Sequence, residues 1–94
     1  MKHTWTYEED LICCREYLDR CIVNPRWQTV ESFLDDLSVK LPNIKRSSLK
    51  MKLQNIKVLL NAYSIVDRIG IAPLNHCSKQ SEIAFKQAYQ EIKK

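Results

Sequence analysis

The chain contains a single glycine, Gly70, among 94 residues. A glycine-rich phosphate loop or a dinucleotide-binding fingerprint needs several glycines at fixed spacing. Tight β-hairpin turns also depend on glycine, because the favoured turns place residues at positive φ. The sequence therefore excludes both kinds of nucleotide-binding loop and the turn-rich hairpins of most all-β folds.

The length fits one domain, residues 1–94, and 45% hydrophobic with 28% charged residues is ordinary for a globular protein. No run of about 18 apolar residues occurs, so we expect no membrane partner. The first residues turn acidic at Glu8–Asp10, where a signal peptide would need an apolar stretch. The expected location is therefore cytoplasmic.

Four cysteines, Cys13, Cys14, Cys21 and Cys77, are present. In a reducing cytosol we expect them to be free thiols, with Cys14 and Cys21 acting as small apolar residues of one helix. The alternative is a metal site made of Cys13, Cys14, His76 and Cys77. Adjacent cysteines do not give the spacing of a structural zinc site, so we predict no metal and no cofactor.

Apolar side chains recur at helical spacing in four stretches, which predicts an all-α fold. The first helix should begin near Tyr7, because Thr6 and Glu9 can form a capping box. It should end at Asn24–Pro25, since the residue before a proline avoids the helical region. Its apolar stripe comprises Leu11, Cys14, Leu18, Cys21 and Ile22.

The second and third helices are expected on either side of a short basic turn. The second starts near Gln28–Thr29, with Trp27 packed at its start, and stops at Pro42–Asn43. The third begins with a serine cap at Ser47–Ser48. Their apolar stripes are Val30, Phe33, Leu34, Leu37 and Leu41, then Leu49, Leu53, Ile56 and Leu60.

The apolar pattern breaks down between residues 62 and 79. We expect a short helical continuation ending at Gly70 and then an ordered loop, with a two-stranded piece as the alternative. A last helix should begin at Ser78 or Ser81 and run to the end. The predicted organisation is a helix-turn-helix core over residues 5–61, a connecting element over 62–79 and a C-terminal helix over 80–94.

Positive charge is concentrated in residues 42–61, which carry five basic side chains and no acidic one. Three short helices with a basic third describe a helix-turn-helix body, whose third helix can enter the major groove of DNA. The predicted phosphate contacts are Lys45, Arg46, Lys50, Lys52 and Lys57, and the predicted base contacts are Gln54 and Asn55. Met51 and Val58 either touch thymine methyl groups or pack under the last helix.

Double-stranded DNA is thus the expected partner, and two other classes of function stay open. A protein-interaction module could use the acidic first and second helices, and a small inhibitor or accessory of a nucleic-acid enzyme would look similar. We expect no enzyme: His76 and Cys77 are only neighbours in sequence, and Asp35–Asp36 fits a solvated face. An outward Tyr17 and Cys13 could serve a dimer, so the oligomeric state is open.

The segment Trp5–Asp10, Trp-Thr-Tyr-Glu-Glu-Asp, resembles the W-T-x-E-E-D opening of Myb and SANT domains. Trp27–Val30 stands near the position of their second tryptophan, and Leu53 occupies the place of the third. The resemblance implies a helix-turn-helix fold that binds DNA or, as in some SANT-like domains, protein.

A second resemblance covers about residues 5–90. Arg46–Asn55 is similar to the R-x-P-x-S-V-x-M-K-L-x-N segment in the N-terminal domain of HNH-type restriction endonucleases. Gly70–Lys79 is similar to the G-L-x-H-x-S-K element that follows there. The resemblance implies a DNA-contacting, restriction-associated domain. It carries over no catalytic residue, because the chain has no H-N-H cluster, so a stand-alone accessory or binding domain is expected.

Overall fold

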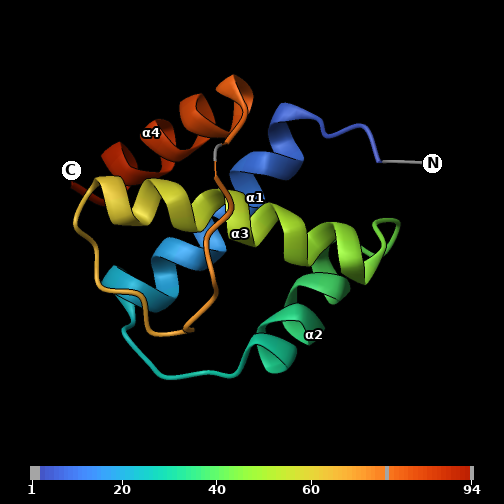
Figure 1. Ribbon diagram of the computed structural model, residues 1–94, viewed down its shortest axis with the longest axis horizontal. Coiled ribbons are helices and arrows are strands. Elements are labelled where there is room, and N and C mark those ends of the chain that lie inside the picture. Colours follow the sequence, from blue (N-terminus) through green and yellow to red (C-terminus); the bar gives the residue numbers. More distant parts are fainter. Residues whose placement is uncertain (1–2, 76, 94) are drawn as a thin grey trace.

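The structure is a computed structural model that describes residues 3–75 and 77–93. Every regular element in this range is helical, and no strand occurs in it, which confirms the predicted all-α class. α1 (Tyr7–Leu18) runs on into a π-helical turn, η1 (Asp19–Val23). It is followed by α2 (Val30–Lys40), α3 (Arg46–Ala62) and α4 (Lys79–Lys93) (Figure 1). Within the described residues, no helix is both long and apolar enough to cross a membrane.

The start of α1 is fixed by the predicted capping box. Thr6 Oγ1 accepts a hydrogen bond from the Glu9 N–H at 3.2 Å, and Glu9 Oε1 accepts one from the Thr6 N–H at 2.9 Å. The bond from the Thr6 N–H, helped by His3, holds the pKa of Glu9 below its ordinary value. η1 stops before Asn24–Pro25, as the proline predicts.

α2 and α3 begin in different ways. Thr29 caps α2, because its hydroxyl accepts a hydrogen bond from the Ser32 N–H at 3.1 Å. The predicted serine cap of α3 is wrong: the helix begins at Arg46, and Lys45 before it provides no side-chain cap. The Arg46 guanidinium donates to two carboxylates of α2. α3 thus begins before the serines that the local capping preference indicates, and its first residue contacts α2.

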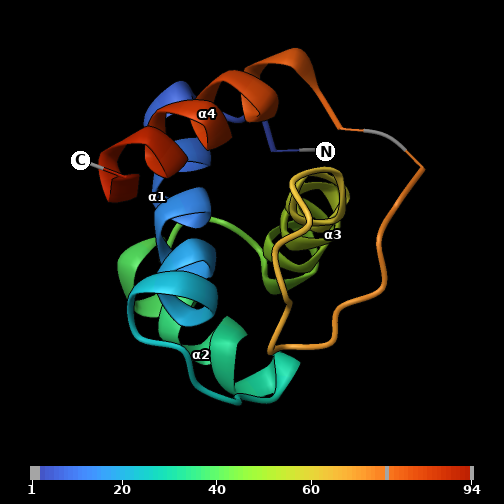
Figure 2. The same cartoon turned by 90° about the vertical axis from the view of Figure 1, so that its left-hand side faces the viewer.

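The predicted apolar stripes meet in one core. α1 packs most extensively on α4, and α3 contacts α1, α2 and α4 (Figure 2). Tyr17 and Cys13, expected to face outward, are fully buried, and the Tyr17 ring meets Phe33 edge-on with centroids 5.4 Å apart. That expectation is wrong because α1 is covered on more sides than its apolar stripe predicts, with Phe33 of α2 packed on Tyr17. The largest fully buried apolar side chains are Tyr17, Phe33, Phe85, Leu18, Leu34, Leu37, Leu49, Leu53, Ile56 and Leu60.

α3 ends at Ala62 instead of continuing toward Gly70, so the predicted helical continuation is wrong. The N–H groups of Ile65 and Ser64 donate to carbonyls of the last turn at 2.9 and 3.1 Å, the pattern of a Schellman motif. Ser64 takes the left-handed conformation, with φ at 57°. Glycine usually marks this position in a sequence, and its absence explains why the helix end was not predicted.

Asp67 organises the segment between α3 and α4. Its carboxylate is 2% exposed and accepts hydrogen bonds from the N–H groups of Ile69 at 2.8 Å, Gly70 at 3.0 Å and Ile71 at 3.2 Å. The Lys57 ammonium donates to it at 2.8 Å. Gly70 sits at φ +78°, a conformation that side chains rarely adopt, so this turn requires the glycine.

The contacts of Asp67 predict that the protein loses part of its folding stability in acid. Burial raises the pKa of this carboxyl, but the Lys57 ammonium and the Ile69 N–H outweigh burial and hold the pKa below its ordinary value. The unfolded value is about 3.9, so the stabilisation is complete above about pH 5 and is lost as the pH falls through the lower folded pKa. In urea unfolding across this pH range, Asp67→Asn should have a lower free energy of unfolding than the unmodified protein above about pH 5. Its free energy of unfolding should also fall less as the pH is lowered. Equal pH slopes for both proteins would contradict the assignment.

Candidate nucleic-acid interface

The outward face of α3 is the surface for which the sequence predicts DNA contact. Five side chains near its N-terminal end are exposed: Lys45, Arg46, Ser47, Lys50 and Met51. The amides of Gln54 and Asn55 follow and are half-buried. Since residues 42–61 contain no acidic side chain, this stretch of the chain contributes only positive formal charge to the face.

Met51 is left uncovered by the last helix. It is 51% exposed, whereas Val58 is half-buried. The segment between α3 and α4 approaches this part of α3, because the Leu74 N–H donates to the Gln54 carbonyl at 3.3 Å. Of the two placements that the sequence left open for Met51, the structure shows the exposed one.

Internal ion pairs occupy several of the predicted phosphate contacts. Arg46, with its side chain 41% exposed, donates to two carboxylates of α2 at 2.6 and 2.9 Å. Lys57 is 16% exposed and pairs with Asp67 at 2.8 Å. Lys45 and Lys50 have no acidic partner among the described residues. The number of basic residues in the sequence therefore overstates the positive charge that this face offers.

Lys52, predicted to contact phosphate, lies instead in a buried polar cluster. Its ammonium lies 2.8 Å from Asp10 Oδ1 and donates to Ser81 Oγ at 2.7 Å. Ser81 donates to the same Asp10 oxygen at 2.7 Å, and Gln80 donates to the other at 2.7 Å. Lys52 thus joins α3 to α1 and α4. The prediction is corrected, because a side chain only 5% exposed cannot reach an external phosphate.

The contact between Lys52 and Ser81 does not make a nucleophile. The Ser81 hydroxyl is fully buried, it accepts from Lys52 and Ser78, and it donates to Asp10, so no substrate can reach it. The cluster is a structural junction. The sequence gives little indication of this cluster, because Asp10 belongs to an acidic first turn. The one indication is that Asp10 stands four residues before Cys14, on the buried side of α1.

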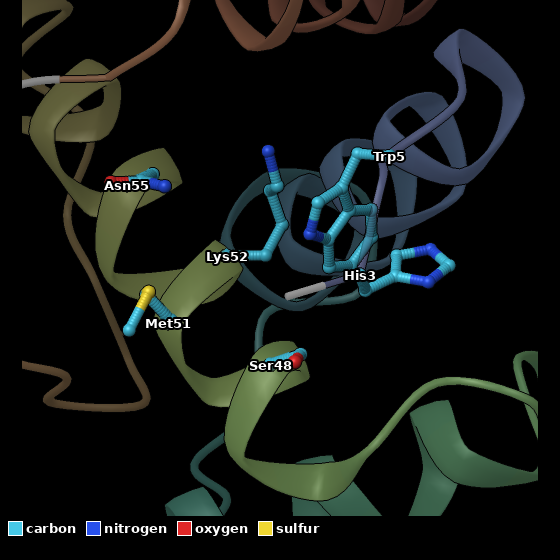
Figure 3. Close-up of a pocket in the computed structure, with 6 residues that line it drawn as sticks. All are labelled: His3, Trp5, Ser48, Met51, Lys52 and Asn55. Atoms are coloured by element: carbon cyan, nitrogen blue, oxygen red, sulfur yellow. The ribbon is translucent and has the colours of Figure 1, made fainter. Parts of the chain in front are cut away.

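A pocket of about 150 Å³ opens between the N-terminal segment and α3 (Figure 3). It is lined by His3, Trp5, Ser48, Met51, Lys52 and Asn55. The Lys52 ammonium lies 4.7 Å from the centroid of the Trp5 ring, and His3 meets that ring edge-on at 5.1 Å. Trp5 therefore packs beside the buried cluster and gives the pocket an aromatic wall next to exposed Met51.

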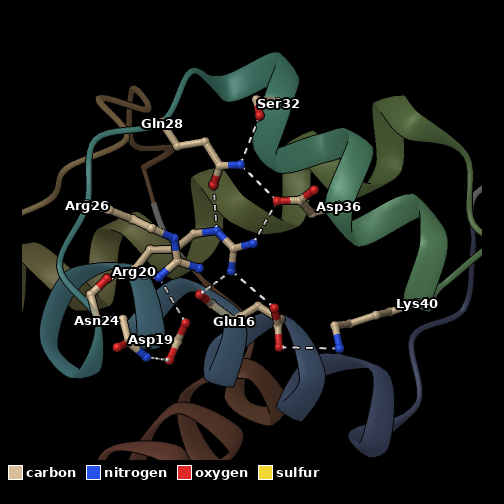
Figure 4. A network of polar contacts seen from close by, with 9 residues as sticks. All are labelled: Glu16, Asp19, Arg20, Asn24, Arg26, Gln28, Ser32, Asp36 and Lys40. Carbon is tan, nitrogen blue, oxygen red and sulfur yellow. Dashed lines mark hydrogen bonds and ion pairs between the residues drawn. The ribbon is translucent and has the colours of Figure 1, made fainter.

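One acidic side chain of α1, Glu16, and one of α2, Asp36, are tied into a network around Arg20 (Figure 4). The guanidinium is 3% exposed and donates to Gln28 at 2.6 Å, to the Glu16 carbonyl at 2.9 Å and to Asp36 at 2.9 Å. The bonds from Gln28 and Arg20 hold the pKa of Asp36 below its ordinary value. These contacts offset part of the acidic charge internally, whereas Glu31 and Asp35 of α2 are 73% and 70% exposed and pair with Arg46.

The cysteines are free thiols within the described residues. Burial raises the pKa of Cys13 to about 12, and it also raises the pKa values of Cys14 and Cys21. Cys77 is half-buried, and His76 lies outside the described residues. No group of three or more potential metal ligands occurs in the part of the chain that the structure describes.

The candidate interface thus consists of the exposed N-terminal half of α3 and the adjoining pocket. Its positive charge comes from Lys45 and Lys50, with Arg46 partly engaged by α2. Its hydrogen-bonding amides are Gln54 and Asn55. Comparison of the chain with protein-family models, with curated proteins and with solved structures gave no match.

Proposed function

We propose that the chain binds double-stranded DNA without catalysis, with α1, α2 and α3 acting as a helix-turn-helix and α3 lying in the major groove. The observation that carries the proposal is the face of α3 from Lys45 to Asn55, which bears exposed cations and two amides and no acid. Cations neutralise phosphates, and amides can pair with base edges. The resemblance of Arg46–Asn55 to a segment of restriction endonucleases points to the same surface.

The burial and ion pairs of the basic side chains reduce the number that we propose to contact DNA. Lys45 and Lys50 bind phosphates, and Arg46 joins them when a phosphate competes with the α2 carboxylates. Gln54 and Asn55 read bases, with adenine the preferred partner of an amide side chain. Lys52 and Lys57 are left out because each already pairs with a buried carboxylate.

The number of phosphate contacts sets the salt dependence of binding. Three contacts predict that log K falls against log salt with a slope of about −2.7, or about 40-fold between roughly 50 and 200 mM salt. Fluorescence anisotropy with a random duplex of about 20 base pairs measures this slope. A slope near −4.5 would mean about five contacts, and it would return Lys52 and Lys57 to the interface.

Charge reversal on α3 tests the location of the interface. We expect Lys45→Glu/Lys50→Glu to weaken duplex binding by about 100-fold or more, because two phosphate contacts become repulsive. Lys79→Glu/Lys86→Glu makes the same change in net charge at exposed positions of α4 and is the matched control. The control should lose less than about tenfold through the weaker overall field. Equal losses, or no binding by the unmodified protein at low salt, would refute the proposal.

A further inference from the structure

Trp27 occupies an unexpected position. The sequence predicts that it packs at the start of α2, but the side chain is 76% exposed in the segment between η1 and α2. Val23, at the end of η1, is 52% exposed, and Val66, in the segment between α3 and α4, is 67% exposed. An indole carries a large apolar area, so an exposed tryptophan is a feature of surfaces that contact a partner.

Arg68 lies against this indole. Its guanidinium carbon is 5.7 Å from the centroid of the Trp27 ring, and its Nε is buried with no hydrogen-bond partner among the residues that the structure describes. Both residues line an open pocket with Gln28, Thr29 and Ile69. A buried N–H group that lacks an acceptor costs free energy, and no described residue supplies an acceptor to this one.

The charges around Arg68 do not supply that acceptor. Asp19 pairs with Arg26 at 3.2 Å, and Asp67, the neighbour of Arg68 in sequence, pairs with Lys57 at 2.8 Å. Arg68 itself has no acidic partner among the described residues. Within the described part of the chain, the Arg68 guanidinium therefore has no carboxylate partner beside an exposed indole, while Arg26 and Lys57 are each paired.

We propose that the Trp27–Arg68 surface binds a segment of a protein partner that presents a carboxylate next to an apolar side chain. The terminal amino groups of Arg68 donate to the carboxylate, and the indole packs on the apolar neighbour. A duplex is a poorer fit, because DNA binding requires several cations together. The surface shares no residue with the proposed DNA-binding face, so each can fail without the other.

Nuclear magnetic resonance of the nitrogen-15-labelled chain tests the proposal through the Trp27 indole and Arg68 Nε–H signals. Three peptides serve as probes: Ac-Leu-Glu-Leu-Glu-Leu-NH₂ with side-chain carboxylates, Ac-Leu-Gln-Leu-Gln-Leu-OH with only a terminal carboxylate, and Ac-Leu-Gln-Leu-Gln-Leu-NH₂ with none. We expect at least one carboxylate peptide to shift both signals saturably. The uncharged peptide should bind about tenfold more weakly or worse. The Trp5 indole is the internal control.

Substitutions test whether Arg68 itself binds the carboxylate or whether only the net charge of the protein matters. Arg68→Gln should weaken binding of the carboxylate peptide by about tenfold or more, and Arg68→Lys should give an intermediate loss because it keeps the charge without the fork. Arg26→Gln, one residue from Trp27 and 43% exposed, should bind as the unmodified protein does. All three should bind duplex normally.

Four results would overturn the proposal. Neither signal shifts with any peptide, or all three peptides bind equally. A duplex shifts the Arg68 signal more than the peptides do at equal concentration, which would assign the surface to nucleic acid. Raising the protein concentration alone shifts both signals, which would make a second copy of the chain the occupant.

Discussion

We expect Lys52→Met to lower the free energy of unfolding by about 3–5 kcal/mol. Methionine replaces much of the apolar stem of lysine but removes the ammonium that pairs with Asp10 at 2.8 Å. The Asp10 carboxylate is fully buried and would then face only the hydroxyl of Ser81 and the amide of Gln80. A buried charge without an opposite charge makes the loss large. Urea unfolding followed by circular dichroism measures it.

Lys50→Met is the matched control for Lys52→Met. It makes the same substitution two positions earlier on α3, where the lysine is exposed. We expect its unfolding free energy to stay within about 0.5 kcal/mol of the unmodified protein, and its duplex binding to weaken. Asp10→Asn combined with Lys52→Met removes the orphaned charge and should recover part of the loss. Equal destabilisation by the two lysine substitutions would contradict the buried cluster.

The second large effect is expected at Arg20, where methionine should cost about 3 kcal/mol of unfolding free energy. The guanidinium joins α1 to α2 through Asp36, and it lies 4.3 Å from the centroid of the Phe33 ring. It also binds Gln28 just before α2. The expected loss stays at the lower end for a buried ion pair, because Asp36 is 49% exposed and water can solvate it once the arginine is gone.

Arg26→Met provides the comparison for Arg20→Met in the same urea experiment. Arg26 is 43% exposed and its ion pair is with Asp19, at 3.2 Å. Exposed pairs contribute about 1 kcal/mol or less, so this variant should unfold close to the unmodified protein. If Arg20→Met proved no more destabilising than Arg26→Met, the network would not hold the two helices together.

The parts of the fold that depend on neighbouring residues follow from the sequence. The bonds between Thr6 and Glu9 reach across three positions, and Pro25 acts on the residue before it. The apolar period of each helix likewise shows which side chains enter the core. Ser64 is the local exception, because a serine in the left-handed conformation gives no sequence sign of the helix end it forms.

The sequence was enough to place the candidate site on α3. It did not show which of the basic side chains there are exposed and unpaired. Lys50 and Lys52 are the same residue type two positions apart, and one is exposed while the other is buried. The difference arises because α1 supplies Asp10 and α4 supplies Ser81 on one side of α3. These partners lie 42 and 29 residues away in the chain, beyond any local pattern.

The sequence by itself determined the helical class, most helix limits, the apolar stripes and the stretch where basic residues gather. The tertiary structure decided which charges stay free, how the segment around Asp67 turns, and that Trp27 faces outward beside Arg68. The physical reason is the distance along the chain over which each interaction acts. Helix periodicity and capping act within a few residues, whereas a charge is buried only where an opposite charge or hydrogen-bond partner arrives from a distant element.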